Sequence, residues 1–126
     1  MGRRSVGGRF GTVVFDCDST LSAIEGVDEL AGAHRAEIVR LTESAMLGDV
    51  ALEEVYGRRL TLIQPTRAQV AAVGALYVER LVPDAMDVVR TLRDAGVRVC
   101  LMSGGLRPAI QVLALALGIP PSDVEA

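Results

Sequence analysis

Two short apolar runs stand out along the chain, and each of them ends in polar residues. The first run, Thr12–Phe15, is β-branched and aromatic and leads into Asp16–Asp18. The second run, Val97–Met102, leads into Ser103–Gly105. Runs of this length and composition are typical of buried strands. We therefore expect two buried strands that each present polar residues at the carboxyl end.

The remaining chain follows the helical period, with capping and stop residues between its segments. Gly48, Gly96 and Gly118 each follow the last turn of a predicted helix. Thr66–Gln69 has the pattern of a capping box, which opens a helix running to about Glu79. The predicted helices are Asp28–Ala33, Ala36–Leu47, Leu52–Ile63, Thr66–Glu79, Asp84–Ala95 and Leu106–Leu117.

This order of elements predicts an α/β fold with a four-helix insertion. Without the insertion, the remainder is a βαβα unit, whose two strands pair in parallel through a right-handed crossover. We expect a flexible tail at 1–11, an α/β core at 12–21 and 83–126, and an inserted helical cap at 22–82. Both strands would end at the same edge of the sheet, where α/β folds bind ligands.

Composition narrows the classes of protein to consider. Half of the residues are hydrophobic, the formal net charge is −3, and all 13 basic residues are Arg. No basic block is present to bind nucleic acid. The longest uncharged stretch, 108–122, is shorter than the ~20 residues of a membrane span, and no signal peptide is expected.

The cysteines and the only histidine carry little chemistry of their own. Cys17 and Cys100 have no CxxC spacing, which favours a reducing cytoplasm; a disulfide between them is the alternative. Cys17 alternates away from the neighbouring aspartates, so we expect it in the core. His34 follows a turn of small residues and is expected at the surface.

Asp16 and Asp18 are the first candidates for chemistry. In an extended chain they share a face, and two carboxylates so placed repel each other unless a cation lies between them. Oxygen ligands of this kind suit Mg²⁺. By itself, an acid pair at a strand end is more typical of a solvated surface. The hydroxyls of Ser19 and Thr20 would either surround an anion or cap the local turn.

The turn Ser103–Gly105 is the second candidate. A hydroxyl, two glycines and a helix N-terminus form a cradle in which backbone N–H groups approach an anion closely. The glycines are equally explained by the dihedral angles of an ordinary turn. Combined with the acid pair on the adjacent strand, the turn predicts a metal-binding acid site that faces a phosphate cradle.

These segments resemble the haloacid dehalogenase superfamily, and within it the phosphoserine phosphatases. Phe15–Leu21 and Glu25–Ala31 are similar to the first motif, Ser103–Gly105 to the second, and Arg59–Pro65 to the cap segment. The resemblance covers nearly the whole chain. It implies a Rossmann-like parallel sheet with an inserted cap, of which only the first half of the sheet core is present.

The resemblance implies the reaction and two catalytic residues. The reaction is Mg²⁺-dependent hydrolysis of O-phospho-L-serine to serine and phosphate, a step of serine biosynthesis. Asp16 would be the nucleophile that forms an aspartyl-phosphate. Asp18 would protonate the leaving serine and then activate water. Asp16 and the backbone carbonyl of Asp18 would help to hold the metal.

The resemblance also implies the substrate contacts. Ser103 and the Gly104 amide would bind the phosphoryl oxygens, while Glu25 and Arg59 would hold the ammonium and the carboxylate. From the helical period alone, Arg59 lies within an apolar stripe and needs an anionic partner, which a substrate or an ion pair inside the cap would provide. From its position alone, Glu25 is more typical of a solvated acid before a helix.

Two parts of the family pattern are missing. One supplies a Lys, and the chain has none; the other supplies aspartates in a GDGxxD-like stretch, whereas only Asp123 and Glu125 follow Ser103. Two parallel strands also leave exposed edges. We therefore expect the N-terminal part of a larger enzyme, with little turnover alone and a tendency to self-associate through uncovered strand edges.

Three alternatives stay open from the sequence. The first is a split enzyme that a partner chain completes. The second is a related phosphatase or phosphotransferase that acts on another small phosphomonoester. The third is a non-catalytic phosphate-binding module.

Overall fold

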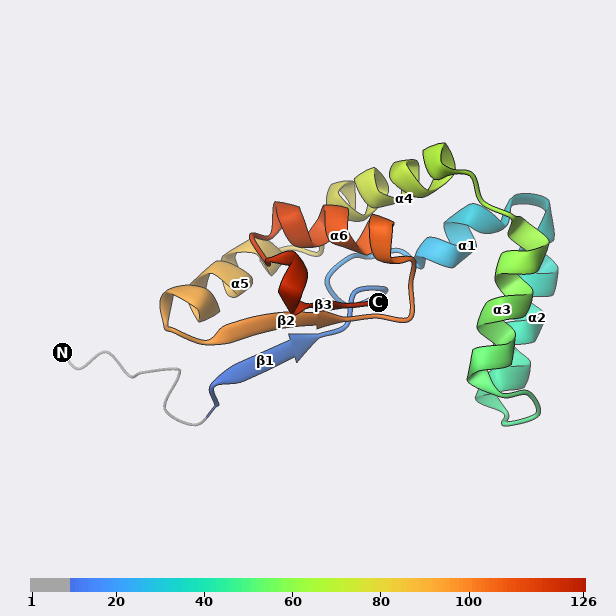
Figure 1. Ribbon diagram of the computed structural model, residues 1–126, viewed down its shortest axis with the longest axis horizontal. Coiled ribbons are helices and arrows are strands. Elements are labelled where there is room, and N and C mark those ends of the chain that lie inside the picture. The colour runs from blue at the N-terminus through green and yellow to red at the C-terminus, as the bar shows by residue number, and fades with distance from the viewer. Residues whose placement is uncertain (1–9) are drawn as a thin grey trace.

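A small parallel sheet forms the base of the molecule, as a computed structural model describes it for residues 10–126 (Figure 1). The strands are β1 (Thr12–Phe15), β2 (Arg98–Met102) and β3 (Val124–Glu125), and they lie in the order β1-β2-β3. Phe15 pairs with Leu101, which pairs in turn with Val124. The expected α/β class with a parallel sheet is confirmed. The tail expected at 1–11 lies almost entirely outside the described residues.

The third strand was not expected, because the segment after Gly118 contains two prolines and acidic residues. In the structure this segment makes the turn η3 (Pro121–Asp123) and then pairs in parallel with β2. Asp123 accepts a hydrogen bond from Nε of Arg98 at 2.8 Å, and Val124 is buried. A strand of two residues is too short to show a sequence period, so it is defined only by its pairing with β2 and by the burial of Val124.

Within residues 10–126 the sheet is covered on one face, so the prediction of buried strands is confirmed for that face and wrong for the other. Val99 and Leu101 are buried beneath the helices, whereas Val14 is 53% exposed and Met102 is 58% exposed. In Figure 1 the helices α4 (Arg67–Glu79), α5 (Ala85–Asp94) and α6 (Arg107–Ala116) lie on the same side of the sheet. An apolar run in the sequence therefore does not show that helices cover both faces of the strand.

All six predicted helices are present, with ends that differ by at most two residues. The remaining helices are α1 (Gly26–Ala31), α2 (Arg35–Met46) and α3 (Leu52–Ile63), and the turn η2 (Gly32–His34) joins α1 to α2. The capping box is confirmed: Gln69 N–H donates to Thr66 Oγ1 at 3.2 Å, and Thr66 N–H donates to Gln69 Oε1 at 2.8 Å. Helix α1 begins two residues before its expected start, and its first N–H donates to the side chain of Asp18, 8 residues earlier in the chain.

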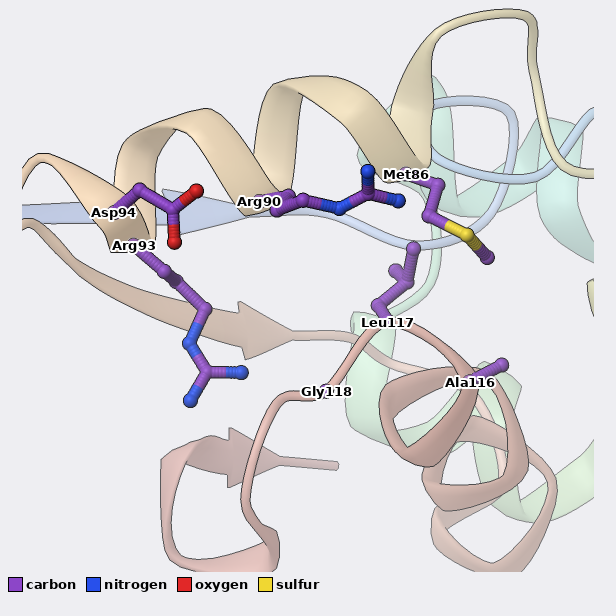
Figure 2. A pocket seen from close by; sticks show the side chains of 7 residues that line it. All are labelled: Met86, Arg90, Arg93, Asp94, Ala116, Leu117 and Gly118. Atoms are coloured by element: carbon purple, nitrogen blue, oxygen red, sulfur yellow. The ribbon is translucent and has the colours of Figure 1, made fainter.

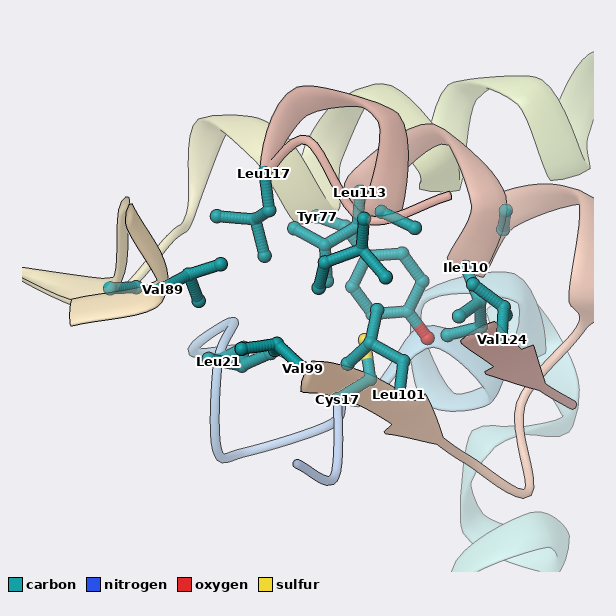
Figure 3. Packing of buried hydrophobic residues seen from close by; sticks show 14 of the residues in the cluster. Cys17, Leu21, Tyr77, Val89, Val99, Leu101, Ile110, Leu113, Leu117 and Val124 are labelled. Carbon is teal, nitrogen blue, oxygen red and sulfur yellow. The ribbon is translucent and has the colours of Figure 1, made fainter. Parts of the chain in front are cut away.

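Helix α4 packs along α6 and thereby closes the core. The two helices meet closely at Gly74, where a Cβ atom would lie 2.8 Å from a methyl group of Val112. Figure 3 shows Tyr77 of α4 packed with Leu113 and Ile110 of α6 above the sheet residues Val99 and Leu101. Helices α2 and α3 pack against each other and extend away from this core (Figure 1).

The remaining expectations concern single residues and the membrane. Cys17 is fully buried and Cys100 partly buried, and both are free thiols. His34 is exposed. No helix among residues 10–126 has the length and apolar character needed to cross a membrane.

Candidate active site

A cavity of about 200 Å³ lies at the carboxyl ends of β1 and β2. It collects residues from the turn after β1, the start of α1, helix α3 and the turn after β2. The lining residues are Asp16, Asp18, Glu25, Val27, Arg59, Gly104 and Gly105. Five of the six predicted site residues therefore line one cavity, and the sixth, Ser103, is hydrogen-bonded to Asp18.

Asp18 is held by three hydrogen bonds from three different elements. Its Oδ1 accepts from the Tyr77 hydroxyl at 2.5 Å and from the Gly26 amide at 2.8 Å. Its Oδ2 accepts from the Ser103 hydroxyl at 3.1 Å. The carboxylate therefore has one orientation, set by α4, by the start of α1 and by the turn after β2.

Asp16 lies next to Asp18 in the cavity but is much less constrained. It is exposed, and its Oδ1 accepts a hydrogen bond from the backbone N–H of Cys17 at 2.7 Å. Its Oδ2 makes no hydrogen bond to any of the residues 10–126. A carboxylate oxygen without a partner at the cavity is available to a cation or to an electrophile.

The thiol of Cys17 is buried next to the acids of the site. Burial, followed by the charges of Asp18, Asp16 and Glu25, raises the pKa of Cys17 to about 12. Burial and the hydrogen bond to Asp18 raise the pKa of the Tyr77 hydroxyl far above its ordinary value. Tyr77 therefore stays protonated and acts as a donor over the whole physiological pH range.

Glu25 lies at the entrance to α1 and faces the same cavity. It is exposed, and its Oε1 accepts a hydrogen bond from the Ser19 hydroxyl at 2.6 Å. Ser19 adopts a positive φ of 55°, which turns the chain back toward Glu25. The sequence left open whether this acid is simply solvated; in the structure it lines the cavity that contains Asp16 and Asp18.

Arg59 enters the cavity from helix α3. Its Nε is buried without a hydrogen-bond partner, and Arg59 forms no ion pair with any residue between 10 and 126. Its guanidinium lies 6.0 Å from the centre of the Tyr56 ring, within the range of a cation–π contact. The neighbouring Arg58 is exposed and pairs with Glu54. The internal ion pair considered for Arg59 is thus not present in the described residues.

The turn after β2 supplies hydrogen-bond donors, but not quite as expected. The Ser103 hydroxyl donates to Asp18 and accepts the Gly105 amide at 3.0 Å, so its proton is directed at the acid rather than into the cavity. The Gly104 amide lies on the cavity wall and makes no hydrogen bond within residues 10–126. Within residues 10–126 the Gly104 amide therefore has no acceptor that would compete with an anion in the cavity.

Asp16 and Asp18 provide carboxylate oxygens of the kind that a hard divalent cation prefers as ligands, although the number of these ligands is small. Asp16 and Asp18 bring two carboxylates together, and among the described residues that line the cavity Arg59 is the only basic one. Mg²⁺ binds through one or two carboxylates and keeps several waters, so this set fits it. No cluster of three or more potential ligand side chains is present among residues 10–126.

Sequence reasoning missed Tyr77 and Gly26. Tyr77 lies 59 residues from Asp18, and nothing local connects the two. A tyrosine on the apolar face of a helix needs a hydrogen-bond partner for its hydroxyl, but the sequence does not show which residue that partner is. Gly26 was treated as part of a loop, although a Cβ at this position would lie 2.0 Å from the Tyr77 hydroxyl oxygen.

Other cavities differ in character. One of about 480 Å³ adjoins the site, shares Arg59, Gly104 and Gly105 with it, and is lined on the cap side by Leu52 and Tyr56. Another, of about 470 Å³, lies between α5 and the end of α6 (Figure 2). Its Arg90 pairs with Asp87 at 3.8 Å, and it shares no residue with the acid site.

Comparison with known proteins gives a consistent picture. The family model described as haloacid dehalogenase-like hydrolase matches residues 10–124. A phosphoserine phosphatase from Mus musculus is 38% identical over 116 residues, which cover 90% of this chain and 52% of that protein. The chain thus spans about half the length of the curated relatives that it matches.

Solved structures agree with this similarity. A phosphoserine phosphohydrolase-like protein from Francisella tularensis superimposes with a TM-score of 0.81 at 27% identity, over 93% of this chain and 57% of that one. A substrate-bound phosphoserine phosphatase superimposes with a TM-score of 0.72 at 26% identity, over 93% and 55% of the two chains.

Proposed function

Since the chain belongs to the haloacid dehalogenase-like hydrolase family, we propose that it carries the nucleophile and substrate-binding groups of a Mg²⁺-dependent phosphomonoester hydrolase acting on O-phospho-L-serine. One observation supports this most directly. The acids Asp16 and Asp18, the acid Glu25 and the unpaired Arg59 line one cavity together with the Gly104 amide. This set matches a phosphate that carries both an ammonium and a carboxylate group.

Asp16 and Asp18 divide the reaction between them. The carboxylate of Asp16 attacks phosphorus, the ester P–O bond breaks, and serine leaves with a proton from Asp18. Asp18 then takes a proton from water, and the resulting hydroxide attacks the aspartyl-phosphate to release phosphate and restore Asp16. The difference in their hydrogen bonding supports this division, because Asp16 has an oxygen without a partner and Asp18 is rigidly oriented.

Recognition of the amino-acid part depends on the cap. Arg59 has a planar fork that suits a carboxylate, and its Nε lacks any other partner. Glu25 faces the same cavity and offers a carboxylate to an ammonium group. The Gly104 amide donates to a phosphoryl oxygen, and Ser103 joins it once its hydroxyl turns from Asp18.

A magnesium ion would be held by the carboxylate of Asp16 and the backbone carbonyl of Asp18. When bound, it would neutralise the charge of the nucleophile and of the phosphoryl group. The 126 residues contain no Lys to complete this compensation, so we expect the chain by itself to turn over phosphoserine poorly. The two free cysteines are consistent with a reducing cytoplasm, which we propose as its location.

Calorimetric titration of the chain with O-phospho-L-serine in the presence of Mg²⁺ tests the proposal. We expect saturable binding that Arg59→Ala weakens by about 10-fold or more, because a hydrogen bond to a charged group contributes about 1.5–3 kcal/mol. Arg58→Ala is the matched control, since Arg58 is exposed and pairs with Glu54; it should change the affinity less than about 2-fold.

Two outcomes would contradict the proposal. Equal affinity for phosphoserine and for a phosphomonoester without an amino-acid group would favour the alternative of another substrate. Binding of phosphate that Asp16→Asn and removal of Mg²⁺ both leave unchanged would favour a non-catalytic phosphate-binding module. Release of phosphate by the chain at the rate of a full-length relative would overturn the expectation of poor turnover.

A further inference from the structure

Tyr77 is the only fully buried aromatic side chain in the part of the chain that the structure describes, and its hydroxyl reaches the candidate active site. Its ring packs between α6 and the sheet (Figure 3), and its hydroxyl donates a hydrogen bond to Asp18. The hydroxyl oxygen lies 2.5 Å from Oδ1 of Asp18. Packing alone would be satisfied by phenylalanine, so the hydroxyl requires a separate explanation.

The two oxygens of Asp18 have different surroundings. Oδ1 accepts both the Tyr77 hydroxyl and the Gly26 amide, which leaves little room for a further ligand. Oδ2 accepts only the Ser103 hydroxyl, at a longer 3.1 Å, and lies 3.3 Å from the Cβ position of Gly105 on the cavity wall. The turn that contains Gly104 and Gly105 therefore meets Oδ2 rather than Oδ1.

The start of α1 is shaped around the Tyr77 hydroxyl. A Cβ at position 26 would lie 2.0 Å from that oxygen and 2.6 Å from the ring carbon Cζ. Glycine is among the least favourable residues within a helix, so its presence in the first turn has a cost. Glycine at position 26 weakens the start of the helix, but it leaves the space that the Tyr77 hydroxyl occupies beside Asp18.

We propose that Tyr77 is a positioning residue for Asp18. Together with the Gly26 amide, its hydroxyl holds Oδ1 and so directs Oδ2 toward the Ser103–Gly105 turn and a substrate bound there. The catalytic meaning of this contact rests on the proposed function, in which Asp18 exchanges a proton with the leaving serine and with water. The contact itself can be tested without turnover.

The absorption of Tyr77 provides the first test. The chain has no Trp and only two tyrosines, so in a Tyr56→Phe background Tyr77 is the sole tyrosine chromophore. A phenol that donates to a carboxylate absorbs at longer wavelength than one with a weaker acceptor. We expect Asp18→Asn to shift the tyrosine band to shorter wavelength, and Asp16→Asn, the matched control, to leave it in place. No shift with Asp18→Asn would overturn the proposal.

Hydrogen exchange at the Gly26 amide provides the second test. This amide donates to Asp18, so its protection depends on how firmly Oδ1 is held. We expect Tyr77→Phe, which keeps the ring, to accelerate exchange at Gly26 about 10-fold or more relative to Leu113 in the core of α6. Equal acceleration at Gly26 and Leu113 would mean that the hydroxyl only stabilises the fold, and would refute the positioning role.

The two tests separate this inference from the proposed function. If the chain fails to bind phosphoserine while both signals behave as expected, the substrate assignment is wrong and the positioning of Asp18 stands. If phosphoserine binds with the expected dependence on Arg59 but neither signal responds, the proposed function stands and the role of Tyr77 is refuted. The absorption test leaves Tyr77 intact, so it decides even if Tyr77→Phe does not fold.

Discussion

Asp16, Cys17 and Asp18 are consecutive residues in three different environments. Asp16 is exposed, Cys17 is completely buried, and Asp18 is half-buried with three donors around it. The alternation of the extended chain explains why the thiol points into the core while both acids reach the cavity. The acids then raise the pKa of the thiol between them, in addition to the effect of burial.

This arrangement predicts a large difference in reactivity between the two cysteines. With its pKa raised to about 12 and no exposure, Cys17 should resist a thiol reagent at pH 8, whereas the partly buried Cys100 should react. The measurement is the stoichiometry of labelling in the folded chain. Cys100→Ser should abolish rapid labelling and Cys17→Ser should leave it unchanged; rapid labelling of the Cys100→Ser chain would contradict the assignment.

The same pKa shift predicts how stability depends on pH. An unfolded thiol ionises near its ordinary value of 9.0, whereas the folded thiol stays neutral up to about 12. The contribution of Cys17 is therefore fully present below pH 9 and is lost as pH rises from about 9 to about 12. Urea unfolding of the wild-type chain should show this decline, and Cys17→Ala should show a smaller one.

At the scale of elements, the contact between α4 and α6 joins the inserted segment to the core. Gly74 allows it, because a side chain there would meet the Val112 side chain of α6. The same packing brings Tyr77, one turn later on α4, to the acids at the end of β1. Helix α4, which lies within the cap expected at 22–82, supplies both core packing and a contact to the site.

We therefore expect Gly74→Ala to destabilise the protein by about 1–3 kcal/mol, because the added methyl would overpack the helix contact. Gly57→Ala is the matched control, because Gly57 lies in α3 with open space around its Cβ position. Alanine there should raise the free energy of unfolding by about 0.5–1 kcal/mol. Urea unfolding measures both. Val112→Ala should recover part of the loss in the Gly74→Ala chain, and independent effects of the two changes would argue against the contact.

At the scale of the molecule, the sheet has an uncovered apolar face and an unpaired edge at β1 within the described residues. Phe10, Val14 and Met102 are 69%, 53% and 58% exposed. Unpaired strand edges template pairing with other chains, and lysine on an edge suppresses this. We propose that a second copy of the chain covers this surface in solution when no other polypeptide does.

Sedimentation velocity over a range of concentrations tests this proposal. The wild-type chain should associate as its concentration rises, and Val14→Lys should shift it toward the monomer. Val39→Lys is the control, since Val39 is also partly exposed but lies on the cap helix α2. A wild-type chain that stays monomeric throughout the range would refute self-association through the sheet.

Much of the site could be predicted because its residues are encoded in short local patterns. Asp16 and Asp18 follow the first apolar run, and the turn Ser103–Gly105 follows the second. The parallel connection brings the carboxyl ends of the two strands together. The helical period placed Arg59 on the apolar face of its helix, and the family resemblance assigned it to the substrate carboxylate. The burial of β1 was overestimated, because a run of apolar residues does not report how many faces of the sheet are covered.

Local period and chain connectivity were enough to predict the α/β class, the six helices and the convergence of Asp16, Asp18 and Ser103. The absence of Lys, on which the expectation of poor turnover rests, is also visible in the sequence alone. Three features could not be read from the chain: α4 lies on α6, one face of the sheet is uncovered within residues 10–126, and Tyr77 donates a hydrogen bond to Asp18. These depend on contacts between residues far apart in the chain, where the fit of side chains rather than any local period selects the partner.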